Sequence, residues 1–531
     1  MWWKIAQKEF SLNLFSARFN ISLLLCLMLI PITIVISLGQ YGKRVGTYQV
    51  DKENAENELK QARVYTAVKP LLVFPPQPLS ILCQGISNQM GHSVRIKVDE
   101  KPLLAEGSSN GSDNPLLMSF FYFDFVHILA ILISLLALVF SYDLFSGERE
   151  NGTLKLVFSN AVSRSTVVAG KISGVFITLV PILILCYLIS IIIILMSPQV
   201  SFSATDWLGV IILFLASIFF MALFIGIGIL VSVKSKSSFN GIVVSFFVWL
   251  WFLFLWPNIS VYASQSFIKI QMLDQLQQSL RVFDDEQEKK TQELRKNLPG
   301  LGMFWNAAAG NDGYLEIVGS AFTAIDDQRK LQEKCGPLRL DYAQKKWQLQ
   351  EVYLAKLERQ ERIARYLSFL SPSELFNHLC SVICHTDAES DKKIMENSRD
   401  YRDLLMSYFV RNKIFSSLIF FTPQRENEFF RTWDDLITFV TGGECKSWND
   451  VFEWGKTHGG SSNVVYKVDY PQGKFTYYKP LDLSDLPKFN QGETNFRDFM
   501  PVVITETGVL LCLFIVLFSL IFNVCIRYDV R

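Results

Sequence analysis

The stretch ISGVFITLVPILILCYLISIIIILMSPQVSFSATDWLGVIILFLASIFFMALFIGIGILVSV (Ile172–Val233) decides the fold class of this 531-residue chain. It consists of two long apolar runs joined by a short polar loop, Pro198–Asp206, and its only charged residue is Asp206. A helix needs roughly 20 apolar residues to cross the hydrocarbon core of a bilayer. Both runs reach that length, so the stretch predicts two membrane-spanning helices with a short connection.

Four further apolar stretches of spanning length lie on either side of this pair. Half of the residues are hydrophobic and only 19% are charged, which is less charge than a soluble chain usually carries. No small-residue cleavage site follows the first stretch, so we interpret it as a retained span and not as a signal peptide. We predict a mainly α membrane protein with six transmembrane helices, at residues 21–38, 119–142, 172–197, 207–233, 238–256 and 501–526.

The basic residues of the short loops indicate the orientation of the chain. Lys and Arg occur near both termini, in the segment 143–171 and directly after residue 233, whereas the loop Pro198–Asp206 contains neither. Basic loops favour the cytoplasmic side, so we expect both termini in the cytoplasm. The net charge of +1 gives no reason to expect nucleic acid as a partner.

This orientation places two large segments outside the cell membrane, residues 39–118 and 257–500. The first begins as a charged helical pattern that continues out of the first span to about Tyr65. The second contains two charged helical patterns, at 271–297 and 341–367, whose apolar positions recur at helical spacing. We expect these two patterns to form a long helical hairpin.

Two further patterns lie later in the second exterior segment. SPSELFNHL predicts a fresh helix in which Ser371 and Glu374 form a capping box. NVVYKVDYPQGKFTYYKP, at 463–480, has the pattern of a β-hairpin with its turn at Pro471-Gln472-Gly473. The larger exterior domain is therefore expected to be helical with a small β portion.

The cytoplasmic pieces are too short for a nucleotide-hydrolysing domain, because an independent core needs roughly 50 residues. The sequence has no Walker A motif either, since GGECKS (Gly442–Ser447) lacks the Gly directly before Lys. If ATP drives this protein, a partner hydrolyses it. The segment 143–171 suits docking of such a partner, because a short helix starting near Thr153 would present an apolar strip that begins at Leu154. The alternative is an ordinary loop helix on the lipid headgroups.

Residues 1–20 predict an amphipathic helix that lies on the cytoplasmic surface before the first span. Its apolar stripe includes Trp3, Phe10 and Leu14, and its basic residues lie on another face. Such a helix serves either as an interfacial anchor or as a contact for a partner.

Asp124, His127 and Glu506 are the ionisable residues nearest the spans, and all three lie at the predicted outer ends. They either tie the spans to the exterior domains or line an exit gate. The centres of the spans carry no charge, which argues against ion-coupled transport, because coupling ions and protons need intramembrane ionisable groups.

The segment NHLCSVICHTD raises the question of a metal site, with His378, Cys380, Cys384 and His385 as candidate ligands. The two histidines cannot both share the helical face of the cysteines, so a buried amphipathic helix is the simpler interpretation and we predict no metal. Disulfide bonds are a further alternative for the cysteines predicted to lie outside the membrane, and the sequence does not determine their pairing. These cysteines are Cys83, Cys335, Cys380, Cys384 and Cys445.

Four segments together resemble the permease subunits of type-2 class ABC exporters. KIAQKEF near the N-terminus resembles their interfacial elbow helix, and YDLFSGERENGTLKLVFSNAVSRSTVVAGK (142–171) resembles their loop between spans two and three. The terminal RYDVR, with FLSPSELFNHL, resembles a subgroup with large exterior insertions. The resemblance implies a half-transporter in a bacterial inner membrane, which couples ATP hydrolysis in another subunit to export or extraction of a substrate.

This resemblance also implies partners and site residues. A second permease subunit, identical or related, would complete the pathway, and two copies of an ABC ATPase would bind ATP and Mg²⁺, so this chain itself would be non-catalytic and hold no cofactor. An envelope protein is a further candidate partner for the exterior domains. The ATPase-coupling role would fall to Glu148, Arg149, Glu150, Gly152, Thr153, Leu154, Leu156 and Arg164.

Two other hypotheses stay open beside the exporter permease. A mechanotransmitter would use the same coupling to move an exterior partner, and nothing would cross the membrane. A membrane-anchored metal-binding protein would use the His and Cys residues of 378–385.

Overall fold

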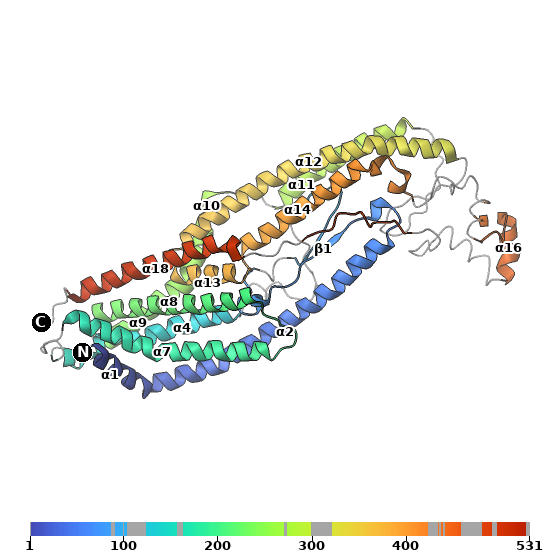
Figure 1. The fold of residues 1–531 in the computed structure, drawn as a ribbon. Coiled ribbons are helices and arrows are strands. Elements are labelled where there is room, and N and C mark those ends of the chain that lie inside the picture. Colours follow the sequence, from blue (N-terminus) through green and yellow to red (C-terminus); the bar gives the residue numbers. More distant parts are fainter. Residues whose placement is uncertain are drawn as a thin grey trace.

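The computed structural model describes residues 2–86, 91–98, 100–102, 124–154, 156, 163–269, 273–298, 321–422, 434, 437–438, 441–457, 480–490 and 496–526. Within these residues, six helices are long and apolar enough to cross a membrane. They lie together at one end of an elongated molecule, and other long helices extend from the opposite side of this bundle (Figure 1). The structure therefore confirms a mainly α membrane protein.

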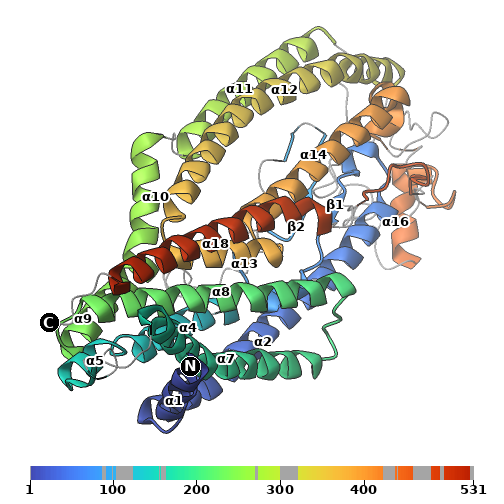
Figure 2. The same ribbon diagram turned by 60° about the vertical axis from the view of Figure 1, so that its left-hand side comes forward.

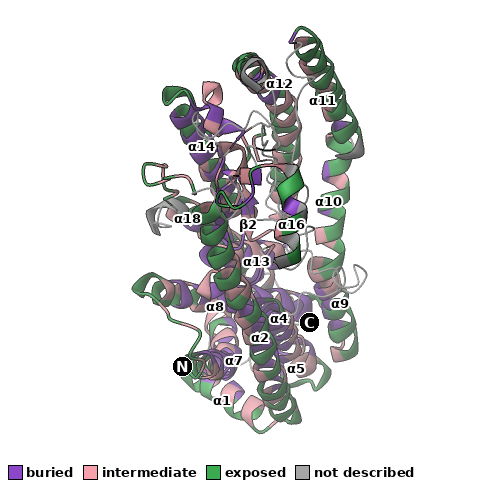
Figure 3. Ribbon diagram, turned by 90° about the vertical axis from the view of Figure 1, so that its right-hand side faces the viewer, coloured by how far each residue is buried: buried purple, intermediate pink, exposed green. Residues whose placement is uncertain are grey.

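The bundle is centred on α4 (Phe125–Ser141) and α8 (Ala204–Lys234), whose most apolar windows are 67% and 61% buried. The same windows of the fifth and sixth spans are only 11% buried, so those helices lie at the periphery (Figure 3). Their exposed faces are apolar and suit contact with lipid or another subunit. The other spans are α2 (Ala17–Gln61), α7 (Arg164–Leu195), α9 (Ser238–Leu250) continued by a π-helical turn (Trp251–Leu255) and α10 (Trp256–Phe267), and α18 (Phe496–Ile526).

Several helices extend beyond the apolar stretches that predict them. The first span continues as one helix to Gln61, as its charged helical pattern indicates. The fifth span, predicted to end at Trp256, continues to Phe267. The loop predicted to end at Lys171 is shorter than expected, because the Ser163 side chain caps α7 by accepting from the Thr166 N–H. Hydropathy therefore identifies the apolar part of a helix, whereas the capping residue identifies where the helix begins.

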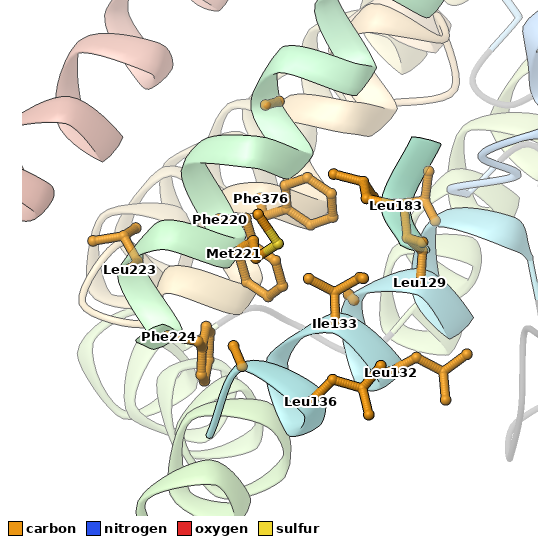
Figure 4. Packing of buried hydrophobic residues seen from close by; sticks show 14 of the residues in the cluster. Leu129, Leu132, Ile133, Leu136, Leu183, Phe220, Met221, Leu223, Phe224 and Phe376 are labelled. Carbon is orange, nitrogen blue, oxygen red and sulfur yellow. The ribbon is translucent and has the colours of Figure 1, made fainter. Parts of the chain in front are cut away.

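The core of the bundle is formed where α4, α7 and α8 meet (Figure 4). Leu129 and Ile133 of α4 and Leu183 of α7 lie close to the Phe220 ring of α8. All four side chains are at most 1% exposed. Phe220 also stacks on Phe376, with ring centroids 4.5 Å apart and planes inclined by 18°.

Phe376 belongs to α13 (Pro372–Ile383), a helix within the segment 257–500 that the sequence predicts to lie outside the membrane. This helix packs along α8 and α18 within the bundle (Figure 1). Its Phe376 lies level with the middle of α8, and its end at Ile383 approaches Gly209 near the start of α8. We call α13 the re-entrant helix, because it packs among the candidate membrane-spanning helices although α12 (Ala321–Ser368) before it and α14 (Ala388–Arg411) after it extend away from the bundle (Figure 1). Its length of 12 residues is too short for a span, so hydropathy does not detect it.

The start of α13 also differs from the predicted capping box. The Ser371 and Ser373 hydroxyls both donate to the Phe252 carbonyl of the π-helical turn, at 2.7 and 2.6 Å. A π-helical turn leaves a carbonyl without its usual i+4 partner, and these hydroxyls satisfy it. Ser371 makes no side-chain cap on α13. Its hydroxyl instead links the start of α13 to the π-helical turn.

The predicted helical hairpin within residues 257–500 is confirmed. α11 (Leu273–Lys296) and α12 (Ala321–Ser368) lie side by side and reach away from the bundle (Figure 2). The Phe283 and Tyr342 rings contact each other across the pair, and Lys346 forms an ion pair with Asp284. α12 returns to the bundle beside α10, where the Trp256 indole donates to the Leu367 carbonyl at 2.9 Å.

Among the described residues, the β structure lies in the segment 39–118, which the sequence predicts to be exterior. β1 (Leu71–Val73) pairs antiparallel with β2 (Ser93–Arg95), with Leu72 opposite Val94. These strands share an apolar core with α14 (Ala388–Arg411). The predicted β-hairpin at 463–480 lies almost entirely outside the described residues, as does the C-terminal RYDVR. A short helix, α16 (Trp448–Thr457), lies at the far end of the molecule (Figure 1).

Candidate functional site

The segment predicted to couple to an ATPase contains a buried ionic triad. The Lys171 ammonium group, on a residue that is 2% exposed, lies 3.0 Å from a carboxylate oxygen of Glu9 and 3.0 Å from one of Glu148. It also donates to the Leu144 carbonyl at 2.8 Å. Three acceptors thus match the three protons of the ammonium group. Glu9 lies on α1 (Trp2–Leu14), Glu148 on α5 (Ser146–Glu150) and Lys171 on α7, so the triad joins three separate elements.

Close packing of α1 on α7 brings Glu9 to Lys171. A Cβ atom on Gly174 would lie 2.5 Å from the Glu9 Cβ, so only glycine permits this approach. Small residues at such crossings let helix backbones come together. Ala6 and Glu9 are the buried residues of α1 and face α7, whereas the predicted apolar stripe residue Trp3 is 49% exposed.

Arg149 and Glu150 bind the ends of two further membrane helices. The Arg149 guanidinium donates to the Ser235 and Val233 carbonyls at 2.7 and 2.8 Å, which satisfies acceptors at the C-terminal end of α8. The Glu150 carboxylate accepts from the Ser238 N–H at 3.1 Å, at the first residue of α9. Both charges agree with the helix dipoles at these ends. The three consecutive charged residues 148–150 therefore tie the loop to α7, α8 and α9.

The rest of the predicted coupling segment divides into outward and inward residues. Gly152 forms a turn with a φ of 69°, and the Thr153 hydroxyl donates to the Glu148 carbonyl at 3.2 Å. Leu154 is only 3% exposed and belongs to the main core, so it is not the surface contact that the sequence suggests. Leu156 is 67% exposed. Arg164 is the first residue of α7 and is half-buried.

The predicted N-terminal helix forms as α1, directly before the first span. α1 ends at Leu14, and α2 begins at Ala17 after the Ser16 side chain accepts from the Phe19 N–H. Phe10 and Leu14 are half-buried. α1, α5 and the last turns of α18 lie at the same end of the bundle (Figure 2).

Two residues of the predicted exit gate, Asp124 and His127, lie at the start of α4, and the third, Glu506, lies on α18. Asp124 caps α4 by accepting from the His127 N–H at 2.7 Å, and it also accepts from the Gln84 N–H at 2.9 Å. Glu506 of α18 lies 2.7 Å from the imidazole of His378 on α13. Glu374 of α13 is close enough to interact electrostatically with both His127 and His378. These contacts attach α13 to its neighbours.

The candidate metal ligands lie on α13 and directly after its end. Among the described residues, no group of three or more His, Cys, Asp and Glu side chains is arranged to hold a metal ion. His378 is paired with Glu506, and the Asp387 side chain caps α14 by accepting from the Glu389 N–H. The hypothesis of a metal-binding protein therefore has no site in the part of the chain that the structure describes.

His385 ends α13 in a left-handed conformation, with a φ of 56°. The Thr386 N–H donates to the Ser381 carbonyl at 2.9 Å, which closes a turn that usually ends on glycine. The left-handed conformation costs a side-chain-bearing residue about 1 kcal/mol.

We expect His385→Gly to be more stable than His385→Ala by about 1 kcal/mol, because both variants lack the imidazole and only glycine removes the strain. Thermal unfolding of the two variants in the same detergent measures the difference. Equal unfolding temperatures, or a less stable glycine variant, would contradict the strained turn.

Sequence reasoning identifies Glu148 but misses its partners. Glu9 occupies a position next to the apolar stripe of an amphipathic helix, and Lys171 begins an apolar run. An acidic residue on the buried side of one helix and a lone basic residue at the start of another are the signal that could suggest a pair. Their distance depends on how α1 crosses α7, which no local pattern gives.

The described part of the chain holds six helices that are long and apolar enough to span a membrane, and a short charged loop binds the ends of three of them. These features define a multi-pass membrane protein. A family model described as ABC-2 family transporter protein matches residues 3–440, and the chain belongs to this family. It is thus the permease component of an ABC transporter. The match covers α1, α5 and α13. A comparison with curated proteins finds no match.

Proposed function

We propose that this chain is the permease half of an ATP-driven exporter, and that α5 with residues 151–156 is its coupling segment. The Lys171 triad carries this proposal, because it connects the segment to α1 and α7 through buried ion pairs of 3.0 Å. Arg149 and Glu150 connect the same segment to the ends of α8 and α9. A push on this loop would therefore reach four helices at once, while the exposed Leu156 side chain would meet the ATPase.

The proposed complex contains two copies of the ABC ATPase and a second permease subunit, identical or related. The ATPase copies hold ATP and Mg²⁺, and this chain contributes no catalytic residue. The weakly buried, apolar faces of the fifth and sixth spans support a contact with a second permease. In this proposal the chain lies in a bacterial inner membrane with both termini in the cytoplasm, as the basic residues of its loops indicate.

Isolation of the full-length chain from its native membrane in a mild detergent tests the proposal. We expect an ATPase with a Walker A motif to co-purify, and the complex to hydrolyse ATP. The chain purified alone should not hydrolyse ATP. An intact chain that retains no ATPase, or an ATPase whose activity is unaffected by the chain, would contradict the coupling.

A mechanotransmitter is a second candidate, and the length of α2 favours it. This helix runs unbroken through 45 residues, or about 68 Å at 1.5 Å per residue, from α1 into the exterior region. The hydrocarbon core is only about 30 Å thick, so a tilt at one end would move the exterior domain.

Reconstituted vesicles separate the two candidates. An exporter should change the contents of the lumen or the leaflets when ATP is added. A mechanotransmitter should instead change the distance between spin labels at exposed positions of α11 and α14, such as Val282 and Leu404, without any cargo movement.

A further inference from the structure

A contact between two segments far apart in sequence lies beside the outer end of α8. Residues 83–86 run against residues 384–386 at the end of α13. The Ile86 N–H donates to the Thr386 carbonyl at 3.0 Å. Gly85 has a φ of 50°, and a Cβ there would lie 2.4 Å from the Thr386 carbonyl oxygen, so the two backbones are in direct contact.

Two cysteine thiols meet within this contact. The Cys83 and Cys384 thiols are close enough to interact with each other, and the Cys83 N–H donates to the Leu79 carbonyl at 3.2 Å. Cys83 is 4% exposed and Cys384 is fully buried. Cys380 lies one turn earlier on α13 and is also fully buried. The backbone contact thus fixes one thiol pair among three neighbouring cysteines.

We propose that Cys83 and Cys384 form a disulfide, which ties the first exterior segment to the re-entrant helix α13. This inference rests on the proposed orientation, because that orientation places both residues on the oxidising side of the membrane. The bond would hold the end of α13 against residues 83–86 while its other end contacts the Phe252 carbonyl. Both ends of the re-entrant helix would then be anchored.

The bond forms by thiol–disulfide exchange with an exterior protein disulfide. One thiol loses its proton and attacks that disulfide, and a mixed disulfide forms. The second thiol then displaces the partner sulfur. Two protons and two electrons leave the cysteine pair, and the partner disulfide becomes a dithiol.

The burial of the pair determines when this exchange takes place. The interaction with Cys384 and burial raise the pKa of the Cys83 thiol, and burial raises that of Cys384. A thiol in the folded protein is therefore both enclosed and weakly reactive. The exchange precedes the docking of α13, and the finished bond is protected from reductants.

Mass spectrometry of the full-length protein tests the proposal. Membranes are treated with N-ethylmaleimide during lysis to block free thiols, and the protein is digested without reductant. We expect a peptide containing Cys83 linked to the peptide that contains Cys380 and Cys384. The link should persist in Cys380→Ala and disappear in Cys384→Ala and Cys83→Ala, which also excludes the pairing of Cys83 with Cys380.

Maleimide adducts on both Cys83 and Cys384 after denaturation would overturn the disulfide, as would a link that is lost in Cys380→Ala. The orientation is measured separately with a membrane-impermeant maleimide on Asn54→Cys, at an exposed position of α2. Labelling from outside together with free thiols would reject the disulfide alone. Labelling only from the cytoplasmic side would reject the orientation in the proposed function, and the peptide result would still decide the bond.

Discussion

Lys171→Met is expected to lower the stability of this permease by about 3–5 kcal/mol and to release the coupling segment from the membrane helices. Methionine retains much of the volume of the lysine stem and removes its charge. Glu9 and Glu148 would then face each other as carboxylates without a cation, with side chains that are only 10% and 19% exposed. Thermal unfolding in detergent measures the loss of stability, and limited proteolysis between residues 141 and 163 measures the release of the loop.

A matched variant separates the lost charge from the lost packing. Glu9→Gln and Glu148→Gln, combined with Lys171→Met, remove both uncompensated charges while the shape of the site is retained. We expect this triple variant to be more stable than Lys171→Met. A Lys171→Met protein that unfolds at the wild-type temperature and resists protease at the loop would show that the triad does not hold the coupling segment.

Leu156→Asp is expected to release the ATPase while the permease stays folded in the membrane. Leu156 is 67% exposed, so a charge there costs the isolated chain little. At an apolar contact with the ATPase the same charge would cost at least about 2 kcal/mol, or about a 30-fold weaker complex. Co-purification of the ATPase and thermal unfolding of the permease, measured on the same preparation, test both parts of this expectation.

Leu154→Asp provides the contrast, because Leu154 is 3% exposed in the main core. A buried carboxylate without a partner destabilises the fold itself. We therefore expect Leu154→Asp to reduce both the unfolding temperature and the ATPase yield. If Leu156→Asp retained the ATPase at wild-type levels, the assignment of this surface as the docking contact would be wrong.

Apolar length and charge pattern are sufficient to predict the spans and the exterior hairpin. Each span is a run of consecutive residues, and the hairpin of α11 and α12 has its own charged helical spacing. The same reasoning does not detect the re-entrant helix α13, because its 12 residues are fewer than a span needs. Its Ser371 also looks like a local helix cap, but the Phe252 carbonyl in another helix takes its hydroxyl.

The candidate site shows the same division. The composition of the loop indicates a docking function, and the resemblance points to Glu148, Arg149 and Glu150 as coupling residues. The direction of each side chain does not follow from either argument. Of the two leucines expected to contact the ATPase, Leu154 is buried and Leu156 is exposed, and the charges of 148–150 face the membrane helices.

The sequence by itself determines the number of spans, the apolar faces and the position of the charged loop, because these properties depend on residues close together in the chain. The tertiary structure alone decides that Lys171 meets Glu9 and Glu148, and that Cys83 meets Cys384. The physical reason is that these pairs form only when helices from distant parts of the chain cross at close range, as the packing of Glu9 against Gly174 shows.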